Sequence, residues 1–262
     1  MHQLLVGTSG FSYDDWKGFF YPEKLAKGDM LGFYAGKFGT VEVNSSFYAI
    51  PAASTFESMA RKTPESFEFV VKAPKDLTHA PKVDPGVIER FIGAIQPLVD
   101  AGKLGCILAQ YPWSFKRTEE NAARVRQLRE TFGDLPVVVE FRNIGWLGKY
   151  TFELLKENAL GFCCVDEPHL KGLMPGVVAA TSSVGYVRFH GRNAEKWWNH
   201  EEAWQRYDYL YSPDELQEWV PKVRDLQAVT EKTYLFFNNH YQGKAAQNAQ
   251  AFAKMLGEPR SQ

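Results

Sequence analysis

The feature that most constrains the fold is an eight-fold alternation of short apolar runs with longer amphipathic segments. Each short run has the length and the β-branched or aromatic residues of a buried strand, and the segments between the runs have helical spacing. Strands that alternate with helices form a parallel sheet with right-handed crossovers. The pattern predicts an α/β fold with strands at residues 4–8, 40–43, 68–73, 104–110, 137–141, 161–166, 186–190 and 234–238.

Chain length narrows the α/β fold to a barrel. The chain has 262 residues, close to the roughly 250 of a (β/α)8 TIM barrel. The rival is an open doubly wound sheet, which loses support because no G-x-G-x-x-G motif follows the first strand. No Pro-, Gly- or Ser-rich linker divides the chain. We therefore expect residues 1–262 to form a single TIM-barrel domain.

Helix-capping signals flank several of the amphipathic segments. Ser54 with Glu57, and Ser212 with Glu215, have the three-residue spacing of a capping box. Asp84 precedes a proline, which is typical of an N-cap followed by the first helical position. These residues predict three helix starts.

The longest irregular stretch covers residues 191–211, after the seventh strand. Loops of that length in compact domains tend to be functional lids or binding elements. Its aromatic content favours a lid over a pocket. The aromatic residues are Trp197, Trp198, Trp204, Tyr207, Tyr209 and Tyr211.

Composition limits the classes of partner and compartment. The chain has 30 Lys and Arg against 31 Asp and Glu, so binding of nucleic acid by bulk charge alone is disfavoured. Cys106, Cys163 and Cys164 lack metal-site spacing, and we interpret them as reduced packing residues. Residues 1–7 do not resemble a signal peptide, and no run reaches the roughly 20 apolar residues of a membrane helix. We expect a cytoplasmic protein without membrane contact.

Charged residues alternate with apolar ones in four of the expected strands. Side chains in a strand alternate between its two faces, so the apolar set is expected to pack on the outer helices and the polar set to point into the barrel. Isolated charges there would be very costly, which predicts partial pairing at the barrel mouth. A purely stabilising ion-pair network is the alternative interpretation. The inward-facing polar residues are Glu42, Asn44, Glu68, Lys72, Glu140, Arg142, Arg188 and His190.

Seven motifs distributed along the chain carry a family resemblance. They are G-T-S-G-F-S-Y-D-D-W-K-G-F-F-Y-P at 7–22, V-E-V-N-S-S-F-Y-A-I-P at 41–51, F-E-F-V-V-K-A-P at 67–74, L-A-Q-Y-P at 108–112, V-E-F-R at 139–142, Y-V-R-F-H-G-R at 186–192 and F-F-N-N-H-Y-Q-G-K-A-A-Q-N-A at 236–249. Together they resemble domain-of-unknown-function family 72, the YecE-like proteins, over nearly the whole chain. The resemblance implies a TIM barrel and supplies no particular reaction.

Four strand ends carry candidates for acid–base catalysis: Glu42, Glu140, Asp166 and His190. The carboxyl ends of barrel strands meet at one mouth, so we expect these groups to converge. We expect His190 to titrate near neutral pH and Glu140 to stay ionised beside Arg142. The alternatives are a loop-capping role for Asp166 and a structural, hydrogen-bonded role for His190.

Candidate substrate-binding residues fall into two groups. The loops after strands seven and eight carry Gly191 with Arg192 and Gly243 with Lys244, where TIM barrels often hold phosphate. Uncharged amides at strand ends suit a polyhydroxyl or base-edge ligand. The full predicted binding set is Asn44, Lys72, Gln110, Arg142, Arg188, Arg192, Asn238, Asn239 and Lys244.

We expect no cofactor and no bound metal. Carboxylates and a histidine at strand ends could hold a divalent ion, but the neighbouring lysine and arginines already neutralise them and would repel a cation. The leading hypothesis is a hydrolase or lyase that acts by acid–base chemistry on an anionic, phosphate-bearing substrate. The alternatives are a nucleic-acid-binding or repair-type protein with a basic, aromatic mouth, and a non-catalytic barrel that binds a metabolite. The sequence makes no prediction of oligomeric state.

Overall fold

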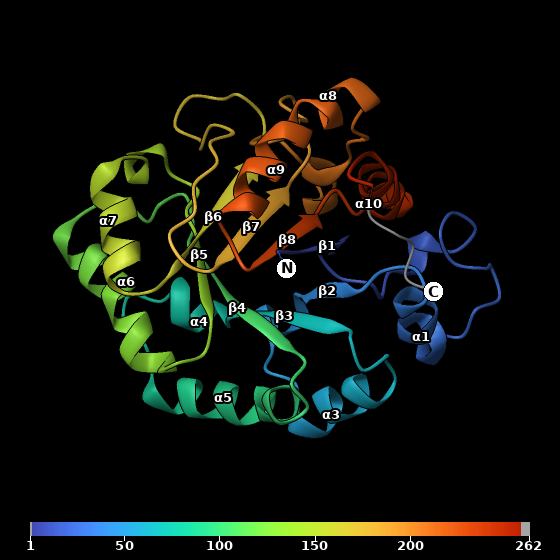
Figure 1. Ribbon diagram of the computed structural model, residues 1–262, viewed down its shortest axis with the longest axis horizontal. Helices are drawn as coiled ribbons and strands as arrows, with labels where there is room; N and C mark the ends of the chain where they lie inside the picture. The colour runs from blue at the N-terminus through green and yellow to red at the C-terminus, as the bar shows by residue number, and fades with distance from the viewer. Residues whose placement is uncertain (1, 258–262) are drawn as a thin grey trace.

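The eight apolar runs form one parallel eight-stranded sheet in the computed structural model, which describes residues 2–257 (Figure 1). The strand order β1-β8-β7-β6-β5-β4-β3-β2 wraps the sheet into a (β/α)8 TIM barrel, as predicted. Each strand except β6 is followed by one or more helices on the outside of the sheet, and residues 167–183 connect β6 to β7 without a helix. The strands are β1 Gln3–Thr8, β2 Thr40–Val43, β3 Glu68–Lys72, β4 Leu104–Gln110, β5 Val137–Glu140, β6 Gly161–Asp166, β7 Val184–Phe189 and β8 Lys232–Phe237.

Helices of very different lengths surround the strands (Figure 1). The longest, α5, packs apolar residues such as Phe91, Ile95 and Leu98 inward, where they are fully buried. Over residues 2–257, none of the helices has both the length and the apolar character needed to cross a bilayer. The α-helices are α1 Met30–Ala35, α2 Ser45–Tyr48, α3 Ala53–Arg61, α4 Lys75–Thr78, α5 Pro85–Asp100, α6 Glu119–Phe132, α7 Lys149–Glu157, α8 Pro213–Gln217, α9 Trp219–Ala228 and α10 Lys244–Met255.

Two of the three predicted caps are confirmed. Ser212 forms a capping box with Glu215 at the start of α8, and Asp84 accepts a hydrogen bond from the Gly86 amide at the start of α5. The predicted box at Ser54 is wrong. The helix α3 begins two residues earlier than that box requires, with Ala52 as its N-cap, so Ser54 already lies inside the first turn.

The barrel closes between β1 and β2 through a side chain. Backbone pairing there is limited to an isolated bridge between Ser9 and Glu42 at the mouth end. Farther down, the hydroxyl of Tyr34 from α1 accepts a hydrogen bond from the Thr8 amide at 2.9 Å and donates one to the Thr40 carbonyl at 3.1 Å. This phenol, which is fully buried, joins two strands that lack a backbone ladder at that level.

Candidate functional site

The barrel interior is polar at every level, unlike the branched apolar filling of most TIM barrels. At the bottom, Glu68 of β3 accepts hydrogen bonds from Lys232 Nζ at 2.7 Å and from the Tyr234 hydroxyl, both on β8. Glu68 therefore faces inward, as the strand alternation predicts. This lower network lies at the amino ends of the strands, where TIM barrels carry stability and not chemistry.

Arg188 of β7 forms the centre of the middle level. Its Nη1 donates to Glu140 Oε2 and its Nη2 donates to Glu42 Oε1, each at 2.6 Å. The other oxygen of Glu42 accepts from the Tyr186 hydroxyl at 2.6 Å. All four side chains are at most 1% exposed. The prediction that charges from strands two, five and seven pair inside the barrel is confirmed.

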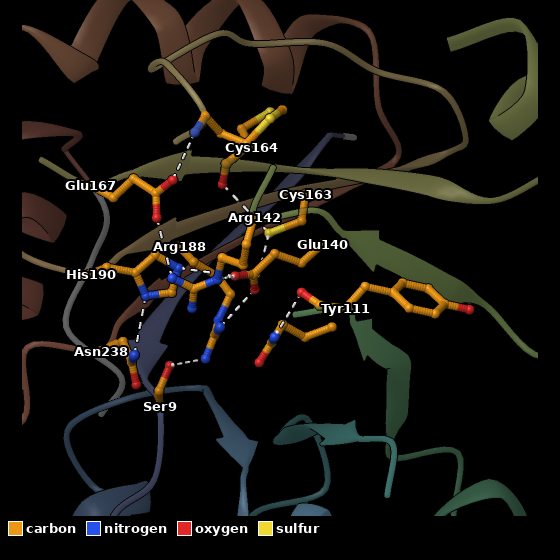
Figure 2. A network of polar contacts seen from close by, with 12 residues as sticks. Ser9, Tyr111, Glu140, Arg142, Cys163, Cys164, Glu167, Arg188, His190 and Asn238 are labelled. Atoms are coloured by element: carbon orange, nitrogen blue, oxygen red, sulfur yellow. Dashed lines mark hydrogen bonds and ion pairs between the residues drawn. The ribbon is translucent and has the colours of Figure 1, made fainter. Parts of the chain in front are cut away.

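Glu140 is the most heavily compensated carboxylate of the cluster (Figure 2). Besides Arg188, its Oε1 lies 2.5 Å from Arg142 Nε and 3.2 Å from His190 Nε2. Burial alone would raise the pKa of Glu140, but Arg142, Arg188 and His190 together hold it well below its ordinary value. Glu140 therefore stays ionised at neutral pH, as predicted.

His190 is a neutral, hydrogen-bonded histidine. Burial lowers its pKa well below the ordinary value, and the nearby Arg142 lowers it further. Its Nδ1 lies 3.1 Å from the Nδ2 amide of Asn238, which can only donate, so the ring proton is on Nε2 and is donated to Glu140. The expectation that His190 titrates near neutral pH is therefore wrong, because both ring nitrogens are already used in a buried setting.

Glu167, which the sequence reasoning missed, extends the cluster toward the mouth. Its Oε2 accepts from Arg142 Nη1 at 3.2 Å and its Oε1 accepts from the Met174 amide at 2.9 Å (Figure 2). Burial raises the pKa of Glu167 to about 7, although Arg142 opposes the shift. Glu167 lies on the same face as Cys163 of β6, whose Sγ is 3.9 Å from Glu140 Oε2, but the apolar residues on both faces of β6 gave no sequence signal for that face.

Asp166 does not join the cluster, contrary to the predicted convergence. As a neighbour of Glu167 it points to the opposite face of β6, where it accepts hydrogen bonds from Tyr211 at 2.7 Å and from the Trp219 indole at 2.6 Å. Its third partner is Arg192, at 2.8 Å. Asp166 thus ties the loop after β7 to α9, outside the barrel wall.

The predicted phosphate site between the loops after β7 and β8 is occupied by protein carboxylates. Arg192 is bound by Asp166, and also by Glu218 at 2.9 Å and Glu215 at 3.4 Å. Lys244 forms an ion pair with Asp208. Because the charges of Arg192 and Lys244 are already balanced, the expectation that they hold an anion is not supported by the geometry.

Asn239 also faces outward, in contrast to Asn238. Its amide donates to the Tyr209 carbonyl and to Asn248 Oδ1 of α10, both at 2.8 Å. Its role is therefore to hold the loop before α8 against α10. The predicted binding role of Asn239 is replaced by the structural alternative that it satisfies loop groups.

Three predicted residues remain at the mouth with spare polar capacity. Asn44 follows β2, and its Oδ1 is buried and accepts no hydrogen bond within residues 2–257. Gln110 ends β4 and donates only to the Tyr111 carbonyl, at 2.9 Å. Lys72 ends β3, with Nζ 4.0 Å from the centre of the Phe47 ring. Burial and Arg188 lower the pKa of Lys72 to about 7.

Part of the aromatic loop after β7 covers the cluster. The rings of Trp197 and Tyr207 lie 6.5 and 6.4 Å from the ring of His190, and Trp197 is 1% exposed. Tyr211 of the same loop instead packs against Phe189 on the outer face of the sheet. The loop therefore has one covering part and one anchoring part, while its movement as a lid stays a prediction.

The cluster is an ionic centre in which Glu42 and Glu140 are paired with arginines. Within the part of the chain that the structure describes, no group of three His, Cys, Asp or Glu side chains is arranged to hold a metal ion. A cavity of about 450 Å³ adjoins the mouth beside α2 and α5. Its wall includes Phe47, Tyr48, Pro74, Asp76 and Arg90.

Comparisons with known proteins agree on one family. The family model DUF72, described as a protein of unknown function, matches residues 5–262. The UPF0759 protein YunF of Bacillus subtilis is 31% identical, over 97% of this chain and 94% of that protein. The crystal structure of a DUF72 family protein of Thermotoga maritima has a TM-score of 0.91 at 42% identity, covering 98% of this chain and all of that one. A DUF72 family protein of Enterococcus faecalis gives 0.87 at 27% identity, covering 98% and 96%.

Proposed function

The chain belongs to the DUF72 family, whose description assigns no function, and from its geometry we propose that it is an enzyme acting on a small anionic substrate by acid–base chemistry. The enzyme would be a hydrolase or a lyase. The resemblance to the YecE-like proteins supplies the fold, so each role below is argued from the residues at the mouth.

One observation carries the proposal: Arg188 bridges Glu42 and Glu140 at the carboxyl ends of three strands. Replacing a buried ion pair with well-packed apolar residues is often neutral or stabilising, so such a cluster is a weak means of stabilising a fold. Ionisable groups with shifted pKa values gather at active sites, and TIM barrels carry their chemistry at the ends where this cluster lies.

Two groups of the mouth have a pKa suited to proton transfer near neutral pH. The pKa values of Lys72 and Glu167 both lie at about 7, close to the optimum for a general acid or base. Glu140 is then a fixed negative charge that orients Arg142 and Arg188, and Glu42 orients Arg188 from the other side. His190 orients Glu140.

Substrate binding falls to the groups with spare capacity. Arg142 retains some exposure at 9%, and a guanidinium is suited to binding a carboxylate or phosphate. Asn44, Gln110 and Asn238 surround the same mouth and offer uncharged hydrogen-bond partners. We propose that the substrate is small and carries one anionic group, with a phosphate ester as the first class to test.

The test is a turnover screen of phosphate esters and other anionic metabolites. Glu140→Gln removes one buried charge at constant shape, and Glu153→Gln makes the same change on the surface of α7. We expect the wild type and Glu153→Gln to turn over a substrate equally and Glu140→Gln to lose roughly 100-fold or more. Equal turnover by all three proteins would remove Glu140 from the mechanism, and tight binding without turnover would favour a non-catalytic barrel.

A second candidate function, nucleic-acid binding, is favoured by one exposed pair of aromatic residues. Trp113 after β4 and Trp198 after β7 are 40% and 52% exposed, with ring centres 5.8 Å apart. Lys116 Nζ lies 3.2 Å from the centre of the Trp113 ring. Aromatic faces beside a cation suit a stacked base of a single strand. Binding of an oligonucleotide whose affinity stays flat from low to high salt would count against this function, because phosphate contacts release counterions.

A further inference from the structure

Lys72 differs from the other cations of the barrel interior because it lacks a bound carboxylate. It is the last residue of β3 and is only partly buried. Within residues 2–257, no hydrogen-bond acceptor or carboxylate oxygen contacts its Nζ. The Nζ atom instead lies 4.0 Å from the centre of the Phe47 ring. An amine held against an aromatic ring, with no acceptor, keeps its lone pair available once it loses a proton.

The charges around Lys72 favour that loss of a proton. Arg188 and Arg142 face it from β7 and from the end of β5, while Glu42 and Glu140 face it from β2 and β5. The two carboxylates are already neutralised by the arginines. Apart from the face of the Phe47 ring, the surroundings therefore give an ammonium group little compensation for its partly buried position.

His79, at the end of α4, adds no negative charge to these surroundings. Its ring lies 5.1 Å from that of Phe47, and burial together with Lys72 lowers the pKa of His79 to about 4. His79 is therefore neutral at pH 7. The charged groups that act on the amine are thus cations and already paired carboxylates.

The cavity of the candidate site reaches the residue that contacts the amine, and Lys72 itself is partly exposed. Phe47 belongs both to the contact with Lys72 and to the wall of the cavity of about 450 Å³. Arg90 lines the same cavity, and Arg142 lies near the amine. Arg90 shares that wall with the carboxylate of Asp76, so the cation that could hold an anionic group beside the amine is Arg142.

We propose that Lys72 is a nucleophile that forms an imine with an aldehyde or ketone substrate carrying a carboxylate or phosphate group. The proposal rests on the enzyme function above and narrows its substrate to carbonyl compounds. Lysines made reactive by an apolar pocket or a neighbouring cation are used in this way by other proteins.

The step balances without an oxidant or a reductant. The lone pair of Nζ forms a bond to the carbonyl carbon, and the π pair of the C=O bond moves to oxygen, which takes up the proton that nitrogen releases. The nitrogen lone pair then forms the C=N bond as the C–O bond of this carbinolamine breaks, and the oxygen leaves as water with a second proton from a general acid, which leaves the imine protonated. Glu167 can exchange protons near pH 7, and Glu42 and Glu140 face the positive charge of a protonated imine.

Lys103 provides an internal control for burial. It is 6% exposed, but its Nζ donates hydrogen bonds to the Ala60 carbonyl at 2.6 Å and to Thr63 at 2.9 and 3.1 Å. It precedes β4, at the barrel end opposite to the mouth. A buried lysine whose donors are all engaged should not react, so comparing the two separates an available amine from a merely buried one.

The experiment traps the imine by reduction. Glyoxylate, an aldehyde with a carboxylate, is incubated with the full chain at pH 7 in the presence of cyanoborohydride, and peptide mass spectrometry locates the added group. With a pKa of about 7, roughly half of the Lys72 amines are unprotonated at pH 7, against about 0.03% for an ordinary lysine of pKa 10.5. We expect Lys72 to be modified at least about ten-fold faster than exposed Lys149, with half-maximal rate near pH 7, and Lys103 to stay unmodified.

The variant Lys72→Met should lose the fast modification while Lys149→Met keeps it. If Lys72→Met fails to fold, the site map of the wild type decides the question alone. Modification that follows exposure, with Lys149 ahead of Lys72, would overturn the proposal. An activity that depends on Glu140 but is retained by Lys72→Met would overturn the role of Lys72 and leave the proposed enzyme function intact. Fast trapping at Lys72 without turnover of any substrate would support a reactive Lys72 and count against the proposed enzyme function.

Discussion

Substituting Arg188 by methionine tests whether the ionic centre of the barrel is as strongly coupled as its geometry indicates. Methionine keeps the length of the side chain and removes the charge. Glu140 would keep Arg142 and His190 as partners. Glu42 would keep only the Tyr186 hydroxyl, so one carboxylate becomes a buried charge without a cation.

The expected loss follows from that single uncompensated charge. Breaking one buried ion pair costs about 3–5 kcal/mol, and for a domain of this size each kcal/mol lowers the Tm by about 2–4 °C. Arg188→Met should therefore lower the Tm by roughly 6–20 °C. The double variant Arg188→Met with Glu42→Gln removes the stranded charge and keeps an acceptor for Tyr186. We expect it to recover at least about half of the loss.

The assay is thermal unfolding followed by the fluorescence of the 7 tryptophans, on wild type, both single variants and the double variant. The control is Arg61→Met, which breaks an ion pair of the same 2.6 Å length to Glu57 on the exposed face of α3. That pair should be worth less than about 1 kcal/mol. Equal losses for Arg188→Met and Arg61→Met, or strictly additive effects in the double variant, would refute the reasoning.

Three further predictions concern stability. Tyr34→Phe leaves the Thr8 amide and the Thr40 carbonyl without their buried partner and should cost about 2–4 kcal/mol in thermal unfolding; a loss below about 0.5 kcal/mol would contradict this role. The pKa of Glu167 rises from 4.5 to about 7 on folding, so its stabilising contribution is complete below pH 4.5 and is lost as the pH rises through 7. Between those limits the free energy of unfolding of the wild type should fall by up to roughly 3 kcal/mol more than that of Glu167→Gln. If urea unfolding at pH 5 and pH 8 gave the same change for both proteins, this role of Glu167 would be contradicted. Ser212→Ala should lower stability by about 1 kcal/mol by removing the cap of α8, and an unchanged urea midpoint would show that this cap contributes nothing.

The sequence was sufficient for the strands and less so for the short helices. The strands at 40–43, 104–110 and 161–166 have the predicted bounds. β7 begins two residues earlier than predicted, at Val184. Its second residue is Gly185, and glycine is more typical of turns than of strands. In the structure, a Cβ there would lie 3.0 Å from Leu226 and Thr230, so glycine allows close packing of helix on strand. Helices of four residues, such as α2 and α4, are too short to show a period.

Prediction of the site succeeded where a strand has one apolar and one charged face. That contrast oriented Glu42, Glu140 and Arg188 correctly. It is missing in β6, whose residues 162–165 are apolar on both faces, so the sequence could not distinguish Asp166 from Glu167. The pairing of Arg192 with Asp166 joins residues 26 positions apart and depends on the path of a loop, which local patterns do not encode.

Because Tyr34 closes the barrel between β1 and β2, this junction is the weakest part of the sheet. Every other pair of neighbouring strands has at least two residues of each strand in backbone register, whereas at this level β1 and β2 share one phenol oxygen. Thermal breathing should therefore separate the first strand from the second before any other pair. The first strand would then stay attached to the eighth, and amide hydrogen exchange should be fastest along that line.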